Sequence, residues 1–171
     1  RFTFARWLLL AGAMLACSVQ AITISPVLIE LSPARRVLSV TISNPSDQAM
    51  NFQTETLAWS QPDGTNHFEP TEDLLVAPPI AEIPPQSSQI FRITLRKPLT
   101  GTVEQTYRLV LEDVSEEVNP QPGVVAIRFK HNLPVYVIPA AETKALPRWS
   151  LCSATKGQCC VRLHNGGSRR L

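Results

Sequence analysis

The amino-acid sequence predicts an all-β fold: a sandwich of about seven strands, followed by the incomplete start of a second β domain. Proline is abundant, with 15 residues against 7 glycines, and this composition disfavours long helices. Short runs of Val, Ile, Thr and Leu are separated by turn sequences at the spacing expected of a sandwich. Several runs alternate apolar and polar residues, the pattern of a strand with one buried face.

The first 21 residues form a segment that we expect to be removed. Arg1 and Arg6 precede an apolar run that ends in small residues and Val19-Gln20-Ala21, which is the layout of a secretory signal peptide. A membrane anchor is the alternative, but the run is shorter than the roughly 20 residues that a spanning helix needs. The sequence therefore predicts an exported protein that begins at Ile22 and has no stable membrane anchor.

The expected mature part is electrically balanced. The chain has 16 basic and 14 acidic residues, and the signal segment takes away two arginines and no acid. Affinity for a phosphate backbone depends on an excess of clustered Lys and Arg. We therefore do not expect a nucleic-acid partner.

The first four expected strands lie between residues 23 and 80. Residues 23–31 are bent by a proline, and residues 37–43 alternate apolar and polar side chains. A third strand at about 49–59 ends at Gln61-Pro62-Asp63-Gly64, a turn in which glycine tolerates a positive φ. After a polar loop, the prolines of residues 74–80 remove ladder donors and restrict this segment to an edge or crossover position.

The last three expected strands are residues 89–96, 106–114 and 124–138. The first two place alternate apolar residues on one face, and Tyr107 fits the tyrosine corner of immunoglobulin-like folds. The third follows an acidic loop and is about 15 residues long, against a usual five or six.

Residues 140–171 offer two further strands, around 148–152 and 160–164. About 32 residues cannot bury enough surface to fold alone. We therefore divide the chain into a signal peptide (1–21), an immunoglobulin-like sandwich (22–139), and a linker with an incomplete second β domain (140–171).

Three cysteines lie in this last region. In an oxidising compartment they favour a disulfide that closes a small hairpin, in which Cys152 pairs with either Cys159 or Cys160. Alternatively, the same cysteines and His164 could bind zinc, but the adjacent pair Cys159 and Cys160 lacks the C-x2-C spacing typical of zinc sites. We expect a disulfide, with no metal and no cofactor.

Several short strings, in their order and spacing, resemble the PapD-like periplasmic pilus chaperones. They cover residues 22–139 and are Ile24-Ser25-Pro26-Val27, Val40-Thr41-Ile42-Ser43-Asn44, Ala77-Pro78-Pro79-Ile80, Ile83-Pro84-Pro85-Gln86, Phe91-Arg92-Ile93-Thr94-Leu95, Tyr107-Arg108-Leu109 and Leu133-Pro134-Val135-Tyr136-Val137-Ile138-Pro139. The form Leu133-Pro134-Val135 is similar to the divergent, archaic branch of the family.

The resemblance implies a chaperone of two immunoglobulin-like domains. Members of the family bind pilus (fimbrial) subunits in the periplasm and pass them to an outer-membrane usher. A subunit lacks its own final strand, and the chaperone fills the resulting groove with the last strand of its first domain, which is donor-strand complementation.

The residues of the last strand support that role on their own terms. Val125, Ile127 and Phe129 alternate with polar or small residues, so that three apolar side chains project from one side at a spacing of ~7 Å. The alternative is that they are ordinary core positions, because a half-buried strand shows the same alternation. The length of the strand and Pro134, which needs an edge for its missing N–H, favour the donor interpretation.

The sequence departs from the best-known members at the residues that hold the carboxylate at the C-terminus of a subunit. Leu28 and Pro134 stand where those members have a basic residue. Arg92 and Arg108 are the substitute candidates, since arginine pairs bidentately with a carboxylate. The alternative is that both are solvated, outward-facing residues.

The sequence fits other classes of function less well than a chaperone. An enzyme is not expected, because the three histidines are scattered and no nucleophile, paired-carboxylate or metal-ligand motif is present. The stronger alternative is an extracellular immunoglobulin-like structural or adhesive module, or a pilus subunit. A subunit should begin with a disordered donor segment and lack its final strand, whereas this chain has a short lead and an extended last strand.

Overall fold

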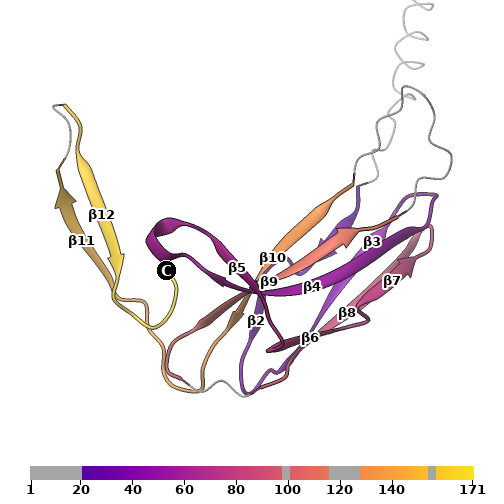
Figure 1. Ribbon diagram of the computed structural model, residues 1–171, viewed down its shortest axis with the longest axis horizontal. Helices are drawn as coiled ribbons and strands as arrows, with labels where there is room; N and C mark the ends of the chain where they lie inside the picture. The colour runs from indigo at the N-terminus through magenta and orange to yellow at the C-terminus, as the bar shows by residue number, and fades with distance from the viewer. Residues whose placement is uncertain (1–20, 98–100, 116–127, 154–156) are drawn as a thin grey trace, which may run out of the picture.

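The fold is a sandwich of two β-sheets followed by a separate hairpin (Figure 1). The computed structural model describes residues 21–97, 101–115, 128–153 and 157–171. One sheet has the strand order β1-β3-β8-β6, and the other has the order β2-β10-β9-β4-β5, with β7 also paired to β4. The predicted all-β, immunoglobulin-like architecture is confirmed.

The strands follow the sequence patterns closely. Their bounds are β1 (Thr23–Ser25), β2 (Ile29–Leu31), β3 (Val37–Asn44), β4 (Met50–Ser60), β5 (His67–Pro70), β6 (Leu74–Ala77), β7 (Ile80–Ile83), β8 (Ser87–Leu95), β9 (Gln105–Asp113), β10 (Lys130–Val137), β11 (Pro147–Cys152) and β12 (Cys160–Asn165). The expected turn after β4 is a short 3-10 element, Pro62–Gly64, in which both Asp63 and Gly64 have a positive φ.

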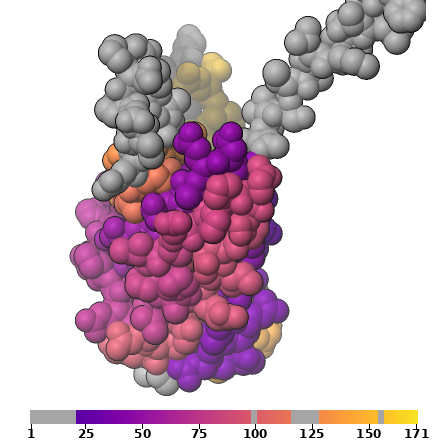
Figure 2. All heavy atoms as spheres, turned by 90° about the vertical axis from the view of Figure 1, so that its right-hand side faces the viewer, coloured from indigo at the N-terminus to yellow at the C-terminus, as the bar shows by residue number. Residues whose placement is uncertain are grey.

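The core lies between the two sheets and uses the inward row of each alternating strand. Its fully buried members include Val40, Ile42, Phe52, Phe91, Ile93, Leu109, Leu111 and Val135. Figure 2 views the sandwich from the side on which β7 and β8 lie in Figure 1, and there the side chains form a closed surface over this core. The inward faces predicted for residues 89–96 and 106–114 are therefore confirmed.

The segment expected as one bent strand, residues 23–31, is divided between the sheets. β1 pairs with β3 in one sheet, and β2 pairs with β10 in the other. The chain crosses between them at Pro26, whose ring removes a ladder donor and interrupts regular pairing.

The region between β4 and β8 contains more strands than expected. Residues 74–80 also divide, into β6 at the edge of one sheet and the start of β7 in the other, so the expected edge or crossover position is confirmed. The expected polar loop contains β5, which pairs with β4. All four residues of β5 are exposed, so this strand has no apolar row by which the sequence could reveal it.

Tyr107 is buried in β9, but its hydroxyl does not make the backbone contact of a tyrosine corner. The oxygen lies 3.1 Å from Oδ2 of Asp73 and 2.9 Å from Oε1 of Gln105. Burial, and after it the charge and hydrogen bond of Asp73, raise the pKa of this hydroxyl.

The hairpin β11–β12 has two different faces. Its register places Trp149 opposite Leu163 and Leu151 opposite Val161, and all four side chains are exposed. The hairpin therefore has an apolar face that the described residues leave uncovered, which supports its interpretation as part of a second β domain. Among the described residues no helix is long and apolar enough to cross a membrane.

Candidate functional site

The last strand of the sandwich, β10, has neighbours that differ along its length. On one side β9 pairs with it from Lys130 to Val137. On the other side β2 pairs with it in parallel, and only from Val135 to Val137. Within the described part of the chain, no strand pairs with Lys130–Leu133 on that second side. The first half of β10 is therefore an open sheet edge.

The hydrogen-bonding groups at this edge can be assigned from two neighbouring contacts. The amide of Asp113 on β9 donates to the carbonyl of Phe129, and the amide of Ile138 donates to the carbonyl of Leu31 on β2. Successive residues of a strand direct their backbone groups to opposite sides. The N–H and C=O groups of Lys130 and Asn132 therefore point to the open edge.

Pro134 lies on the same side of β10 as these groups. Its missing N–H is directed away from β9, toward the position where β2 begins. This placement agrees with the expectation that Pro134 needs an edge, since no β9 hydrogen bond is lost there.

The side chains of β10 continue in one row from the core to the solvent. Leu133, Val135 and Val137 face the core and are buried. Phe129 belongs to the same row by its position but is 53% exposed, and its ring is stacked on His131 at 6.1 Å between centroids. Phe129 is thus not a core residue of the sandwich. Val125 and Ile127, the other two expected donor residues, lie outside the described residues.

Of the expected last strand, residues 124–138, the structure describes residues 128–138. Residues 124–138 were expected as one strand, whereas β10 begins at Lys130, and residues 128 and 129 are not in regular strand. β9 ends at Asp113, one residue beyond the partner of Lys130, so β9 offers few further residues with which the chain before Lys130 could pair. The remainder of the expected strand lies outside the described residues.

An ion pair links β9 and β10 at the open end of the edge. Nζ of Lys130 lies 2.9 Å from Oε2 of Glu112, opposite it in the ladder. The hydrogen bond that the ammonium of Lys130 donates to this carboxylate, and after it the charge of the carboxylate, raise the pKa of Lys130. Both groups are exposed, so the pair favours the local geometry with little net stabilisation.

Arg92 and Arg108, the candidate carboxylate contacts, are not brought together. Arg92 is exposed on β8 and Arg108 lies on β9, and each alternates with core residues of its own sheet. The two side chains therefore point outward from opposite sheets. The guanidinium carbon of Arg108 lies 3.8 Å from the ring centroid of Trp59, on β4, so it is directed away from β10. A role for either residue in binding stays a prediction.

A charged cluster that the sequence did not indicate joins the end of the chain to the sandwich. The guanidinium of Arg170 donates to the carboxylates of Glu104 and Glu30 and lies 3.7 Å from the ring centroid of Tyr136. Arg169 approaches the same two carboxylates, at 3.8 Å and 3.7 Å. These partners are 66 and 140 positions from Arg170, and no local pattern signals such a contact.

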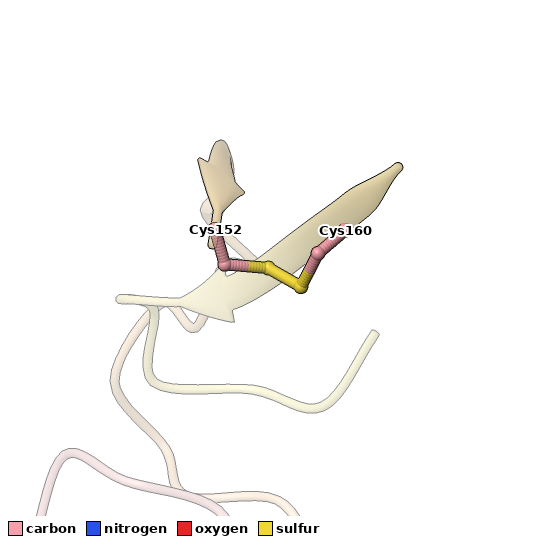
Figure 3. The surroundings of a disulfide bond; sticks show 2 residues. All are labelled: Cys152 and Cys160. Atoms are coloured by element: carbon pink, nitrogen blue, oxygen red, sulfur yellow. A yellow bond between two sulfur atoms is a disulfide. The ribbon is translucent and has the colours of Figure 1, made fainter. Parts of the chain in front are cut away.

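The disulfide joins Cys152 to Cys160 across the hairpin (Figure 3). Cys159 is free and exposed. The expected disulfide is thus present, and of the two possible partners of Cys152 the structure pairs Cys160. A bridge to Cys159 would move β12 by one residue and set its apolar row against Arg148 and Ser150. The alternation of the two strands was therefore a signal that could have selected Cys160. No group of three or more potential metal ligands occurs among the described residues.

Comparison with known proteins identifies this architecture. The family model described as "Pili and flagellar-assembly chaperone, PapD N-terminal domain" matches residues 21–142. A search of curated proteins finds no match to the sequence. Similar solved structures share the fold at low sequence identity.

Three of these structures are chaperones of pili or fimbriae. In the chaperone–tip adhesion subunit complex CsuC–CsuE, from archaic Csu pili of Acinetobacter baumannii, the similar chain is 19% identical, with a TM-score of 0.69, over 87% of this chain and 73% of that one. The class 5 fimbriae chaperone CfaA is 17% identical, with a TM-score of 0.65, over 86% and 68%. In the Salmonella enterica complex of SafA pilin with the SafB chaperone, the similar chain is 16% identical, with a TM-score of 0.62, over 81% of this chain and 66% of that one.

Proposed function

Since the chain belongs to the family of pili and flagellar-assembly chaperones, whose PapD N-terminal domain it contains, we propose that it captures pilus subunits through the open edge of β10. In this function β10 completes the unfinished sheet of a subunit, and the chaperone then delivers the subunit to an outer-membrane usher. The apolar, secretory-type segment at residues 1–21 supports a periplasmic location. The family is one of chaperones, a non-enzymatic class.

The observation that carries the proposal is the open half of β10. Its backbone groups offer a ladder to an incoming strand, and strand addition of this kind uses main-chain hydrogen bonds for affinity and side-chain pockets for register. An unprotected edge is otherwise a liability for aggregation. A strand that continues an apolar row into solvent therefore fits a partner that covers it.

Phe129 is the exposed apolar side chain that the described residues offer for this contact, and we include Val125 and Ile127 on the pattern of the sequence. Burying one large apolar side chain contributes about 1.5 to 3 kcal/mol to a complex. Three such side chains would supply enough to offset part of the entropy lost on association. The capture site is thus a row of alternate side chains on one edge.

Co-expression with pilus subunits encoded beside this chain tests the proposal. The exchange Phe129→Asp, or Ile127→Asp, should remove the subunit from the purified chaperone, since a charge would enter an apolar groove. Val37→Asp is the matched control, because Val37 is also about half exposed but lies on β3 in the other sheet. Unchanged co-purification with both donor variants, while Val37→Asp also has no effect, would refute the donor role.

A pilus subunit or an adhesive module is the alternative function on the same fold. A subunit in this pathway lacks its last strand, but here β10 is present and completes the sheet between β9 and β2. This supports the chain as the donor of a strand. Capture of the chain by another chaperone in the same co-expression experiment would favour the alternative.

A further inference from the structure

One polar side chain interrupts the apolar row of the last strand. The alternate residues of this row are Val125, Ile127, Phe129, His131, Leu133, Val135 and Val137. His131 is the one member whose side chain can form hydrogen bonds. It lies opposite Leu111 of β9 on the inward face, where the row passes from the buried Leu133 to the exposed Phe129. An imidazole therefore stands where the alternation predicts an apolar group.

The imidazole of His131 is not satisfied within the described part of the chain. Its Nε2 atom is buried and has no hydrogen-bond partner among the described residues. Its ring stacks on the ring of Phe129, which is an apolar contact. A buried polar group without a partner destabilises the folded state, and most such groups in native proteins are bonded. An apolar residue at position 131 would therefore suit the isolated sandwich better.

The position beside His131 is open to an added strand. β9 accompanies β10 on one side, whereas no strand of the described part of the chain pairs with Lys130–Leu133 on the other side. Neighbouring strands lie about 4.8 Å apart, so an added strand brings one of its own inward-facing side chains next to the imidazole. The partner that Nε2 lacks can therefore come from a captured strand.

A single polar residue in an apolar row is a physical means of fixing register. In coiled coils, one buried asparagine among apolar residues lowers stability and yet specifies how the helices align. The apolar side chains of a strand repeat every ~7 Å, so a slip of two residues matches one apolar side chain with the next and keeps the same face buried. A polar position distinguishes such registers, because a slipped partner leaves it without a hydrogen bond.

We propose that His131 fixes the register of a captured strand, through a hydrogen bond between its Nε2 and a hydroxyl or amide side chain at the facing position of that strand. Hydroxyl and amide groups can both donate and accept, so they match either tautomer of a neutral imidazole. The inference depends on the proposed capture function and specifies its ligand, an apolar strand with one Ser, Thr, Asn or Gln at the level of His131. A strand that is apolar throughout leaves Nε2 unbonded and is captured less tightly.

The test compares two variants of His131, using the subunit recovered with the wild-type chain in the co-expression experiment. His131→Leu should weaken capture about tenfold, because the polar group of the subunit loses its partner, while the denaturation midpoint of the free chain should not fall. His131→Gln keeps a polar atom near the place of Nε2 and should restore capture to within about threefold of the wild type. The matched control is His67→Leu, which should change neither measurement, because His67 is exposed on β5 at the far edge of the same sheet.

A double-mutant cycle identifies the facing residue of the subunit. Its replacement by Val should weaken capture by the wild-type chain about tenfold and should cause no further loss with His131→Leu. Equal capture by the wild type and His131→Leu, or a loss of capture that accompanies a lower denaturation midpoint of the free chain, would overturn the register role. If Phe129→Asp also leaves capture intact, the proposed function fails with it; if Phe129→Asp abolishes capture, only the role of His131 is wrong.

Discussion

The two ends of β10 carry the same sequence pattern and have opposite environments. At the closed end, Val135 and Val137 lie between β9 and β2 and are fully buried. At the open end, Phe129 continues the same row, but among the described strands only β9 accompanies β10 there, and the ring is half exposed. Alternation therefore decides which face a side chain occupies, and the neighbouring strands decide whether that face is covered.

This difference separates core positions from exposed positions along a single strand. Buried residues at the closed end stabilise the sandwich, whereas the exposed Phe129 at the open end contributes little to it and is the residue that the proposed function assigns to a partner. Substitutions at the two ends should accordingly affect different measurements.

Val135→Asp should have the largest effect. The side chain is fully buried between the sheets, and an unpaired carboxylate there should cost about 4 kcal/mol or more of unfolding free energy. Chemical denaturation measures this loss, and an insoluble variant agrees with it. Asn132→Asp, on the exposed face of the same strand, is the control and should unfold almost as the wild type does. A stable Val135→Asp protein would show that the two ends do not differ in burial.

Tyr107→Phe, beside Val135 in the ladder, should cost about 1 kcal/mol at neutral pH, the usual contribution of a hydrogen bond. Because burial and Asp73 raise the pKa of the Tyr107 hydroxyl, its contribution is complete below the unfolded-state pKa of about 10. It is then lost as the pH rises above that value. Denaturation at neutral and alkaline pH should show a steeper alkaline loss for the wild type, and equal slopes would contradict this.

Phe129→Asp should change the unfolding free energy by no more than about 0.5 kcal/mol, as is usual for exposed positions. The same substitution should abolish capture of a subunit. Denaturation and co-purification of one preparation measure both effects. A large loss of stability would indicate that Phe129 belongs to the core after all.

Glu112→Gln should have the smallest effect on folding, because the ion pair with Lys130 is exposed. Its consequence should appear in the titration of Lys130 instead. The hydrogen bond and charge of Glu112 raise the pKa of Lys130, so any stabilisation by the pair is complete below the ordinary lysine pKa and is lost as the pH rises from there through the raised pKa of the folded protein. Nuclear magnetic resonance titration of the ammonium group should show a lower pKa in the variant, and an unchanged value would contradict the pairing.

Much of the fold could be predicted from local pattern. Alternation identified the buried faces of β3, β8 and β9, and prolines identified the edge position of β6. The exposed strand β5 was missed, because its four residues show no apolar row and its pairing with β4 is the only reason that it is a strand.

The candidate site was predictable only in part. Phe129 and Pro134 followed from the pattern of the last strand. The open half of β10 did not, because it depends on where β2 begins along the edge of β10. The contacts of Arg170 with Glu104 and Glu30 were also unpredictable, since they join parts of the chain that are distant in sequence.

The sequence by itself determined the strands with a buried face, the turns that separate them and the orientation of their side chains. These properties depend on neighbours two residues apart and on the backbone preferences of proline and glycine. Only the tertiary structure decided which strands lie side by side, and with that which half of β10 is open. The reason is that sheet pairing joins residues distant along the chain, and every residue except proline offers the same backbone donor and acceptor.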